Sequence, residues 1–338
     1  MSGLYADDKA AQIGVTLTLS ILVLTDIIGN SLVIKIILTN KSLRSPMIYL
    51  LLNLAVADLM VGVFFSPLYI FSQFFSHPDG IVGTVVCKLL TGGYFAWIGG
   101  ACSAATLVAI SFERYFAVMH PYSKKYKLNG RKVKQVIAGC WTSAFVIIIP
   151  CFLALDYDKE THLCMQIWSK KWFGSAYSTL CFIYFGVIPI TIMLVLYSRV
   201  IYTLWFKQNQ EQGTQLAVLK SRKRVTKVVV IVSVIFAACW LPDSIIYLLY
   251  HYTDIEYNYS VDVPSICGII LVTCNSSINP FIYTFQSKVF RRHLIELVYC
   301  RKSRKNAFRY DNKRDSIYTS MKNPRSGIND ETTNEHSM

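Results

Sequence analysis

The chain has 338 residues, of which 53% are hydrophobic and 16% are charged, and its formal net charge is +14. Because a soluble globular protein carries closer to about 25% charged residues, this composition argues against a soluble enzyme. The apolar residues come in blocks of about twenty or more, as in a polytopic membrane protein. The basic residues lie between these blocks, so we expect no nucleic acid as a partner.

Seven apolar blocks are long enough to cross a bilayer as helices, which takes about twenty residues. In chain order they are expected at residues 12–38, 47–75, 85–118, 133–155, 174–206, 223–250 and 263–285. Residues 286–299 have apolar and charged side chains on different faces, which predicts a short amphipathic helix at the interface. The predicted fold class is an all-α membrane protein, a seven-transmembrane helix bundle (12–285) with a short amphipathic eighth helix. Residues 1–11 form the N-terminal segment, and the polar stretch 300–338 is expected to be a disordered tail.

The distribution of basic residues predicts how the bundle is inserted. Most Lys and Arg lie after the first, third and fifth spans and beyond residue 287, whereas the other side carries five lysines. Cytoplasmic loops are rich in Lys and Arg. We therefore expect a multi-pass protein of the plasma membrane, with an extracellular N-terminus, a cytoplasmic C-terminus and the lipid bilayer as a partner. The outer stretches are mildly acidic, which either favours a cationic ligand or reflects ordinary solvated loops.

Charged side chains inside a span are costly and are therefore candidates for function. The sequence places Asp26 in span one, Asp58 in span two, and Glu113 and Arg114 at the inner end of span three. Asp243 falls in the outer half of span six.

Short motifs occur in every span in a fixed order. They are Gly29-Asn30, Leu54-Ala55-Val56-Ala57-Asp58, Glu113-Arg114-Tyr115, Trp141 with Pro150, Pro189 with Tyr197, Phe236 with Cys239-Trp240-Leu241-Pro242, and Asn279-Pro280-Phe281-Ile282-Tyr283. Each motif alone is a weak signal, but together, in this order and in these spans, they are not expected by chance. The chain resembles a rhodopsin-like (class A) G-protein-coupled receptor, most like the neuropeptide-receptor group.

The resemblance implies a coupling site at the inner end of the bundle. In such receptors the Arg that corresponds to Arg114 is held by its acidic neighbour in the off state and contacts a heterotrimeric G protein in the on state. The residues implied in coupling and activation are Glu113, Arg114, Tyr115, Tyr197, Asn279, Pro280 and Tyr283. Many relatives also carry an acid at the base of span six that holds the Arg. Here that stretch is Ser221-Arg222-Lys223-Arg224, so this lock is absent and a less firmly held off state is expected.

A switch beneath the ligand is also implied by the resemblance. Phe236 and Trp240 would form its packing, and Pro242 removes a backbone hydrogen bond and gives span six a hinge. Pro189 weakens span five in a similar way. Outward movement of span six would then couple the ligand to the cytoplasmic side.

A polar network is expected around Asp58, at positions where the family binds sodium. Its members are Asn30, Asp58, Ser103, Asn275, Ser276 and Asn279. Carboxylate, hydroxyl and amide oxygens suit a hard cation, so an allosteric sodium ion is one interpretation. A purely structural polar network uses the same residues and stays open as the alternative. No other cofactor is expected.

Cys87 precedes span three and Cys164 lies between spans four and five, and the family pairs these two cysteines in an oxidising compartment. From Cys87 to Arg114 there are 27 residues, two more than is usual for the family. We expect either Gly92-Gly93 or Gly99-Gly100 to absorb the extra residues in a bulge.

Three modifications are expected outside the spans. Asn258 stands in an N-glycosylation acceptor of the third outer loop, and Cys300 is a juxtamembrane palmitoylation site. Ser and Thr residues of the tail suit a receptor kinase and an arrestin-type partner.

The ligand class is narrowed by what two spans lack. Span three has no carboxylate of the kind that receptors for biogenic amines carry, and span seven has no Lys for a retinal Schiff base. Asp243 follows Trp240 by three residues on one helical face, and Tyr247 continues that stripe. Asp243 is therefore expected to face the cavity and pair with an ammonium or guanidinium group. A structural partner among neighbouring polar residues or water stays open as the alternative. The further candidates for ligand contact are Tyr94, Trp97, Tyr69 and Gln73.

These features favour a receptor for a basic or amidated neuropeptide. A small cationic ligand anchored on Asp243, or an orphan receptor with constitutive activity, are the alternatives. A transporter would show inverted repeats, and an intramembrane enzyme would show paired acids, a Ser/His pair or a His-rich metal set. The sequence has none of these patterns in its spans, so no catalytic residue is expected.

Overall fold

The structure is a computed structural model that describes residues 9–40, 45–71, 78, 80–123, 125–126, 128–158, 163–207, 214–253, 263–286 and 288–298. The chain divides into two compact units, Met1–Arg291 and Arg292–Met338. The predicted sites at Gln73, Asn258 and Cys300, and the tail from residue 299 onward, lie outside the described residues.

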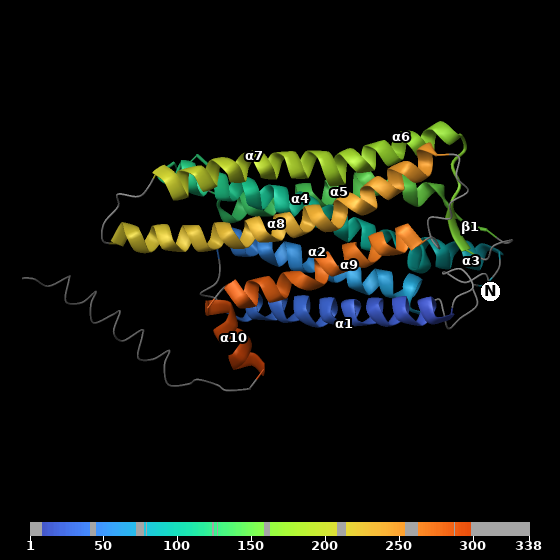
Figure 1. Ribbon diagram of the computed structural model, residues 1–338, viewed down its shortest axis with the longest axis horizontal. Coiled ribbons are helices and arrows are strands. Elements are labelled where there is room, and N and C mark those ends of the chain that lie inside the picture. The colour runs from blue at the N-terminus through green and yellow to red at the C-terminus, as the bar shows by residue number, and fades with distance from the viewer. Residues whose placement is uncertain are drawn as a thin grey trace, which may run out of the picture. The chain divides into compact units, whose positions relative to one another are not determined.

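Within the described residues, seven helical segments are long and apolar enough to cross a membrane (Figure 1). Their elements are α1 (Lys9–Thr39), α2 (Pro46–Tyr69), α3 (Gly80–Val86), η3 (Cys87–Thr91), α4 (Tyr94–Met119), α5 (Gly130–Ala154), α6 (Lys171–Phe182), η4 (Ile183–Val187), α7 (Ile188–Tyr202), η5 (Thr203–Lys207), α8 (Thr214–Tyr252) and α9 (Val263–Gln286), where η marks a π-helical turn. The predicted seven-span bundle is thereby confirmed. The largest difference at an end is in span six, because α8 begins at Thr214 and not at residue 223. Span two also differs, since α2 stops at Tyr69 and not at residue 75.

The outward surface of the bundle is apolar, as lipid contact requires. Along α1 the exposed large side chains Ile13, Leu17, Ile21, Leu24 and Ile28 recur with the helical period. In water such a stripe would be covered by another element, whereas in a bilayer it faces the lipid chains.

Local sequence sets where α2 and α5 begin. Ser45 caps α2 by accepting a hydrogen bond from the backbone N–H of Ile48 at 3.3 Å, and Pro46 occupies the first turn, where it needs no N–H partner. Asn129 caps α5 by accepting from the N–H of Lys132 at 2.9 Å. Each helix therefore starts directly before its apolar block.

Span three is interrupted near its start. The π-helical turn η3 follows α3, and the chain passes through Gly92 and Gly93 before α4 begins. Gly93 has a φ of 70°, a conformation that favours glycine. A π-helical turn holds an extra residue, so η3 and this break accommodate the two additional residues. Of the two glycine pairs considered, Gly92-Gly93 is thus correct, whereas Gly99-Gly100 lies within regular α4.

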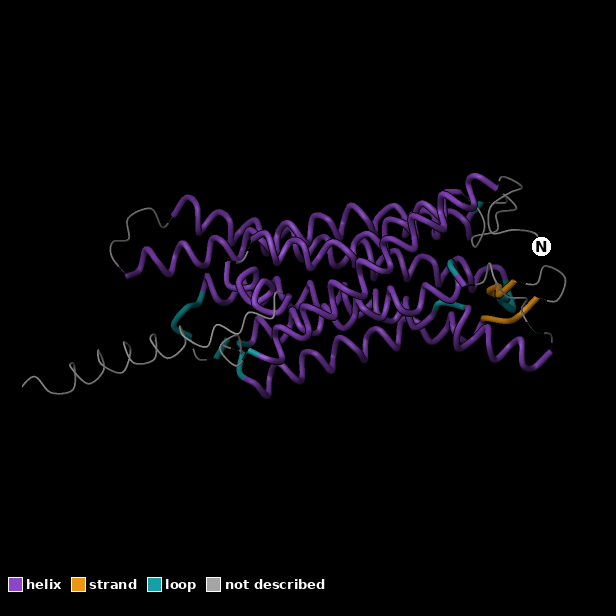
Figure 2. The backbone as a smooth tube through the Cα atoms, turned by 90° about the horizontal axis from the view of Figure 1, so that it is seen from below, coloured by secondary structure: helices purple, strands orange, loops and turns teal. Residues whose placement is uncertain are grey.

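The prediction of a purely helical chain missed two short strands. Leu155–Asp158 (β1) and Leu163–Gln166 (β2) form an antiparallel hairpin in which Tyr157 lies opposite Cys164. Residues in this part of the sequence indicate only a polar loop, because strands of four residues show too little alternation to be recognised. The hairpin contacts α3 and η3 and lies at one end of the bundle (Figures 1 and 2).

Helix α4 lies at the centre of the packing, against α2, α5, α7 and α8. Small residues permit these close approaches, as is common between helices in membranes. A Cβ atom on Gly99 would lie 2.5 Å from the backbone oxygen of Ala57 in α2. Similarly, a Cβ atom on Gly29 of α1 would lie 2.8 Å from the ring of Pro280 in α9.

The predicted amphipathic helix is present as α10 (Lys288–Val298). Within it Glu296 pairs with Arg292 at 3.8 Å and lies 3.1 Å from the ring of His293. These spacings, i,i+4 and i,i+3, place the three side chains on one face of the helix.

Candidate functional site

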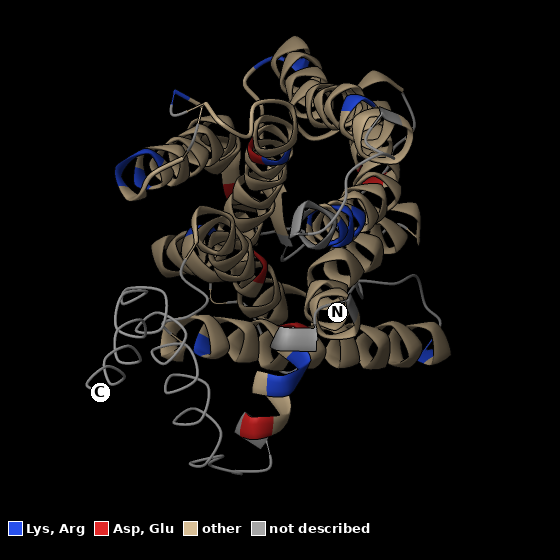
Figure 3. Cartoon of the chain, turned by 90° about the vertical axis from the view of Figure 1, so that its left-hand side faces the viewer, with Lys and Arg blue, Asp and Glu red and all other residues tan. Residues whose placement is uncertain are grey.

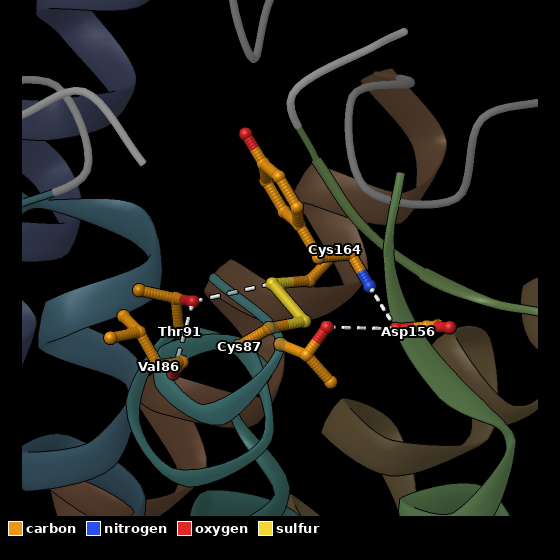
Figure 4. Close-up of a disulfide and its surroundings, with 7 residues drawn as sticks. Val86, Cys87, Thr91, Asp156 and Cys164 are labelled. Atoms are coloured by element: carbon orange, nitrogen blue, oxygen red, sulfur yellow. Dashed lines mark hydrogen bonds between the residues drawn. A yellow bond between two sulfur atoms is a disulfide. The ribbon is translucent and has the colours of Figure 1, made fainter. Parts of the chain in front are cut away.

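The predicted disulfide between Cys87 in η3 and Cys164 in β2 is formed, with the Cα atoms 5.7 Å apart (Figure 4). The hydroxyl of Thr91 lies 3.2 Å from the sulfur of Cys164, and Asp156 in β1 accepts a hydrogen bond from Thr84 at 3.1 Å. These contacts fix the hairpin to the start of span three. We call this end of the bundle the disulfide end, and the opposite one the Arg114 end.

A pocket lies inside the bundle towards the disulfide end, between α4, α5, β2, α6, η4 and α8, with a cavity of about 70 Å³. We call it the central pocket. Four of the six predicted ligand residues line it, namely Tyr94, Trp97, Asp243 and Tyr247. Tyr69 does not: it is buried in α2 with its ring edge-on to Phe65, at a centroid distance of 5.6 Å.

Asp243 is the acidic residue among those that line the central pocket, and it is only 3% exposed. Gly268 of α9 lies against its carboxylate, since a Cβ atom there would lie 2.6 Å from Oδ1. One turn along α8, the hydroxyl of Tyr247 donates to Oε1 of Gln166 at 2.7 Å. Gln166 therefore connects the end of the hairpin to α8 across the pocket.

Trp240 also lines the pocket and is held by aromatic rings on several sides. Its indole stacks on Phe185 at 4.9 Å and on Phe236 at 5.7 Å, and meets Trp97 edge-on at 6.0 Å. A Cβ atom on Gly100 in α4 would overlap the far edge of the indole. The predicted packing of Phe236 under Trp240 is present, and Pro242 lies inside α8 between Trp240 and the next turn.

The polar network around Asp58 is fully buried. Ser103 donates to Oδ1 of Asp58 at 3.0 Å, and Asn279 donates to Oδ2 at 2.7 Å. Both amide atoms of Asn275 and the Oδ1 atom of Asn279 are buried without a hydrogen-bond partner among the described residues. Buried polar atoms are normally satisfied, so these atoms have capacity for a further polar group or ion.

A second buried acid, Asp26, lies on α1 beside this network. Asn30 donates to its Oδ1 atom and, at 3.2 Å, to the backbone oxygen of Ser276 in α9. The other carboxylate oxygen of Asp26 faces Gly62 of α2, where an added Cβ atom would overlap it. Asn30 thus links α1 to α9, as its predicted place in the network requires.

At the Arg114 end, Arg114 is paired with Glu113, and both side chains are only 12–13% exposed. Tyr197 of α7 and Tyr283 of α9 are buried nearby in their helices, each 5% exposed. Tyr115 packs edge-on against Phe116 at 5.5 Å. Figure 3, viewed from this end, shows basic residues on several helix ends.

A family model described as "7 transmembrane receptor (rhodopsin family)" matches residues 29–283, from the glycine of the first motif to the last tyrosine of the seventh. The chain belongs to this rhodopsin family. It is therefore a G-protein-coupled receptor embedded in a membrane, and not an enzyme.

Receptors with related sequences come from animals as distant as rats, fish and moths. The pyroglutamylated RF-amide peptide receptor of Rattus norvegicus is 26% identical over 293 residues, which cover 80% of this chain and 67% of the relative. The galanin receptor 2a of Danio rerio is 27% identical, with coverages of 86% and 80%. The allatostatin-A receptor of Bombyx mori is 29% identical, with coverages of 81% and 76%. The predicted likeness to the neuropeptide-receptor group is confirmed.

Several residues of this receptor's pocket were missed by the sequence reasoning. Gln166, Cys151, Tyr177 and Phe185 line the central pocket, but none of them was among the predicted ligand contacts. The periodicity of a span predicts which face is buried, but not which buried face borders a cavity. Gln166 carries no signal at all, because the hairpin and the disulfide place it.

Proposed function

We propose that this receptor responds to a peptide that enters from the disulfide end and places a basic or amidated group against Asp243. The observation that carries this proposal is a carboxylate, 3% exposed, in the wall of a cavity. A peptide ligand is further supported by relatives whose names specify such ligands, among them an RF-amide peptide.

The size of the central pocket favours insertion of one end of a longer ligand. A cavity of about 70 Å³ has room for a few water-sized groups, which is far less than the roughly 300–1,000 Å³ of a site that encloses a drug-sized molecule. A side-chain tip or a terminal amide fits this space. The rest of the peptide would lie along the hairpin, outside the cavity.

The charge of Asp243 selects among the groups that could enter. A buried carboxylate is stabilised by N–H donors, above all by charged ones, and it repels a second carboxylate strongly because the surroundings are apolar. An ammonium, a guanidinium or a carboxamide therefore fits, whereas a free carboxyl terminus does not.

Insertion in the plasma membrane with the disulfide end outside is part of the proposal. Disulfides persist in oxidising compartments, and basic residues such as Arg131, Lys134 and Arg222 are found at the Arg114 end, in agreement with the positive-inside rule. Receptor kinase and arrestin would then meet the tail, at residues beyond 300, on the cytoplasmic side.

The route of the signal follows from the contacts of Trp240. A ligand that binds better when Trp240 has moved from Gly100 shifts the receptor towards that state. Because Pro242 lies in the same stretch of α8, this helix can bend there and move its other end. Separation of α8 from its neighbours at the Arg114 end would open a space beside Arg114, in which the G protein can replace Glu113 as its partner.

A sodium ion is proposed for the network around Asp58. The chain offers a carboxylate, the Ser103 hydroxyl and the buried, unpartnered Asn275 and Asn279 oxygens, which suit a hard cation. The ion would neutralise the Asp58 charge and hold α2, α4 and α9 together. The rival interpretation is a structural network completed by water. It predicts the same thermal stability in sodium and in choline salts, whereas a bound sodium ion predicts higher stability in sodium.

The proposed function is tested in cells with a library of amidated peptides, their free-acid counterparts and small amines. Receptors carrying Asp243→Asn and Asp243→Glu are compared with Asp156→Asn, which removes an exposed negative charge at the same end but keeps an oxygen that can accept from Thr84. A charged hydrogen bond contributes about 1.5–3 kcal/mol, so Asp243→Asn should weaken an amidated or basic peptide about tenfold or more, while Asp156→Asn leaves it nearly unchanged.

Two outcomes would overturn parts of this proposal. A peptide response that survives Asp243→Asn would remove Asp243 as the anchor. A response to small amines alone, lost in the same variant, would favour the small cationic ligand over the peptide.

A further inference from the structure

At the Arg114 end, the described part of α8 carries no acidic residue that could pair with Arg114. Between Thr214 and Pro242 the sequence of α8 contains no Asp or Glu, and Arg114 is paired with Glu113 on its own helix. An ion pair therefore does not join α8 to α4 through Arg114. Other contacts must keep the coupling site closed.

Helix α8 is held unevenly along its length. It packs extensively against α9 and, towards the disulfide end, against α6, but it meets α4 and α7 at far fewer positions. Opening of the coupling site separates α8 from α4 and α7. The few side chains in the contact between these helices therefore determine how firmly the site is closed.

A separate apolar cluster lies in this contact. Val118 of α4, Val200 of α7, Leu204 of η5 and Leu219 of α8 pack together, and none is more than 6% exposed. Leu219 is the member contributed by α8, so movement of this helix away from its neighbours would expose all four side chains to water.

One turn further along α8, Lys223 lies over the indole ring of Trp205, with its Nζ atom 5.4 Å from the ring centroid. Trp205 belongs to η5, directly after Leu204 of the cluster. A cation over the face of Trp is the most favourable pairing of this kind, and it again joins α8 to the end of span five.

We propose that these two contacts form an inner latch, made of Val118, Val200, Leu204 and Leu219 with the Lys223–Trp205 pair, that closes the coupling site of this receptor. The latch holds the position of α8 through apolar burial and a cation–π contact. It acts at the Arg114 end only and is independent of what ligand the central pocket takes.

The test measures whether Leu204, which is 0% exposed, becomes accessible when the latch is weakened. Leu204→Cys receptor in lipid nanodiscs is treated with a water-soluble maleimide, and labelling at position 204 is followed by mass spectrometry. Cys102, buried in α4, serves as an internal reference in the same molecule. Basal nucleotide exchange on purified G proteins is measured alongside.

The variants separate charge, ring and apolar burial. A cation–π contact at an exposed site is worth a factor of about 2–5, so Lys223→Gln should speed labelling by that factor, whereas Lys223→Arg retains the parental rate. Leu219→Ala should speed labelling about tenfold or more, because it removes most of a buried leucine side chain. Leu219→Met should speed labelling only slightly. Lys220→Gln removes an equal charge from an exposed neighbour and should change nothing.

The expected result is faster labelling of position 204, with raised basal exchange, in Lys223→Gln and Leu219→Ala while Cys102 stays protected. Equal rates in Lys223→Gln, Leu219→Ala and Lys220→Gln would overturn the proposal. So would labelling of Cys102 that rises in parallel, since the variants would then loosen the whole bundle.

Discussion

Gly100 decides how closely the indole of Trp240 approaches α4, and Gly100→Ala is the sharpest perturbation of that contact. A Cβ atom at this position would overlap Cη2 of the indole and lie 2.7 Å from Cζ2. Phe185 and Phe236 cover the indole at 4.9 and 5.7 Å, so the ring cannot yield without moving its neighbours. We expect the added methyl group to displace Trp240.

The magnitude follows from two opposing terms. Overpacking in a well-filled interior costs about 1–3 kcal/mol, while replacing a helical glycine by alanine gains up to about 1 kcal/mol. If a state with Trp240 displaced relieves the overlap, Gly100→Ala favours that state by about 5- to 150-fold relative to the present one, using about 1.4 kcal/mol per factor of ten.

The assay compares Gly100→Ala with Gly139→Ala, a helical glycine of α5 with no atom within 4 Å of the added Cβ. Both variants gain the same helix propensity, so their difference isolates the contact with Trp240. Basal nucleotide exchange should rise in Gly100→Ala alone, and thermal stability should fall in Gly100→Ala and rise slightly in Gly139→Ala. Indistinguishable stability and basal activity in the two variants would refute the reasoning.

Three further changes probe other parts of the bundle. Asp26→Asn should raise the melting temperature at neutral pH, because one buried carboxylate oxygen of Asp26 has no hydrogen-bond partner among the described residues and a buried amide costs less than a buried charge; a lower melting temperature would contradict this. Cys87→Ser should cost about 2–5 kcal/mol in stability, since it opens the link to Cys164 over 77 residues. The difference between the variant and wild type should vanish when both are measured fully reduced. Gly268→Ala should weaken the same ligands as Asp243→Asn, since its Cβ atom would lie 2.6 Å from that carboxylate; ligand dose-response curves in which only one of the two variants shifts would separate their roles.

The central pocket shows what sequence periodicity predicts and where it stops. Trp240, Asp243 and Tyr247 recur at helical spacing on one apolar span, so their shared face was predictable and all three line the cavity. Tyr69 in span two was also a candidate for ligand contact, but its ring is buried against Phe65. Both positions face the interior, and only the packing of the whole bundle decides which interior face is hollow.

The irregular parts of the bundle were predictable only in outline. An excess of two residues indicated a bulge in span three, yet the choice between Gly92-Gly93 and Gly99-Gly100 depends on which pair must pack in a regular helix against Ala57. The inner latch gave no sequence signal, because Leu219 stands in a stretch dominated by basic residues. Its burial comes from η5, whose position follows from the packing of span five.

The latch also sets what a ligand must supply to open the coupling site. Burial of a leucine side chain contributes about 1.5–3 kcal/mol, and a cation–π contact at an exposed site about 0.5–1 kcal/mol. Leu219 and Lys223 together therefore oppose opening by about 2–4 kcal/mol. A ligand overcomes this only if it binds the open state about 30- to 1,000-fold more tightly than the closed one. One charge-assisted contact to Asp243, worth about 1.5–3 kcal/mol, overlaps the cost of about 2–4 kcal/mol if it is made in the open state alone. Release of Trp240 from Gly100 then need contribute little of the free energy of opening. A receptor whose α8 has no acid between Thr214 and Pro242 can therefore be silent before its ligand arrives and still respond to one small group in its pocket.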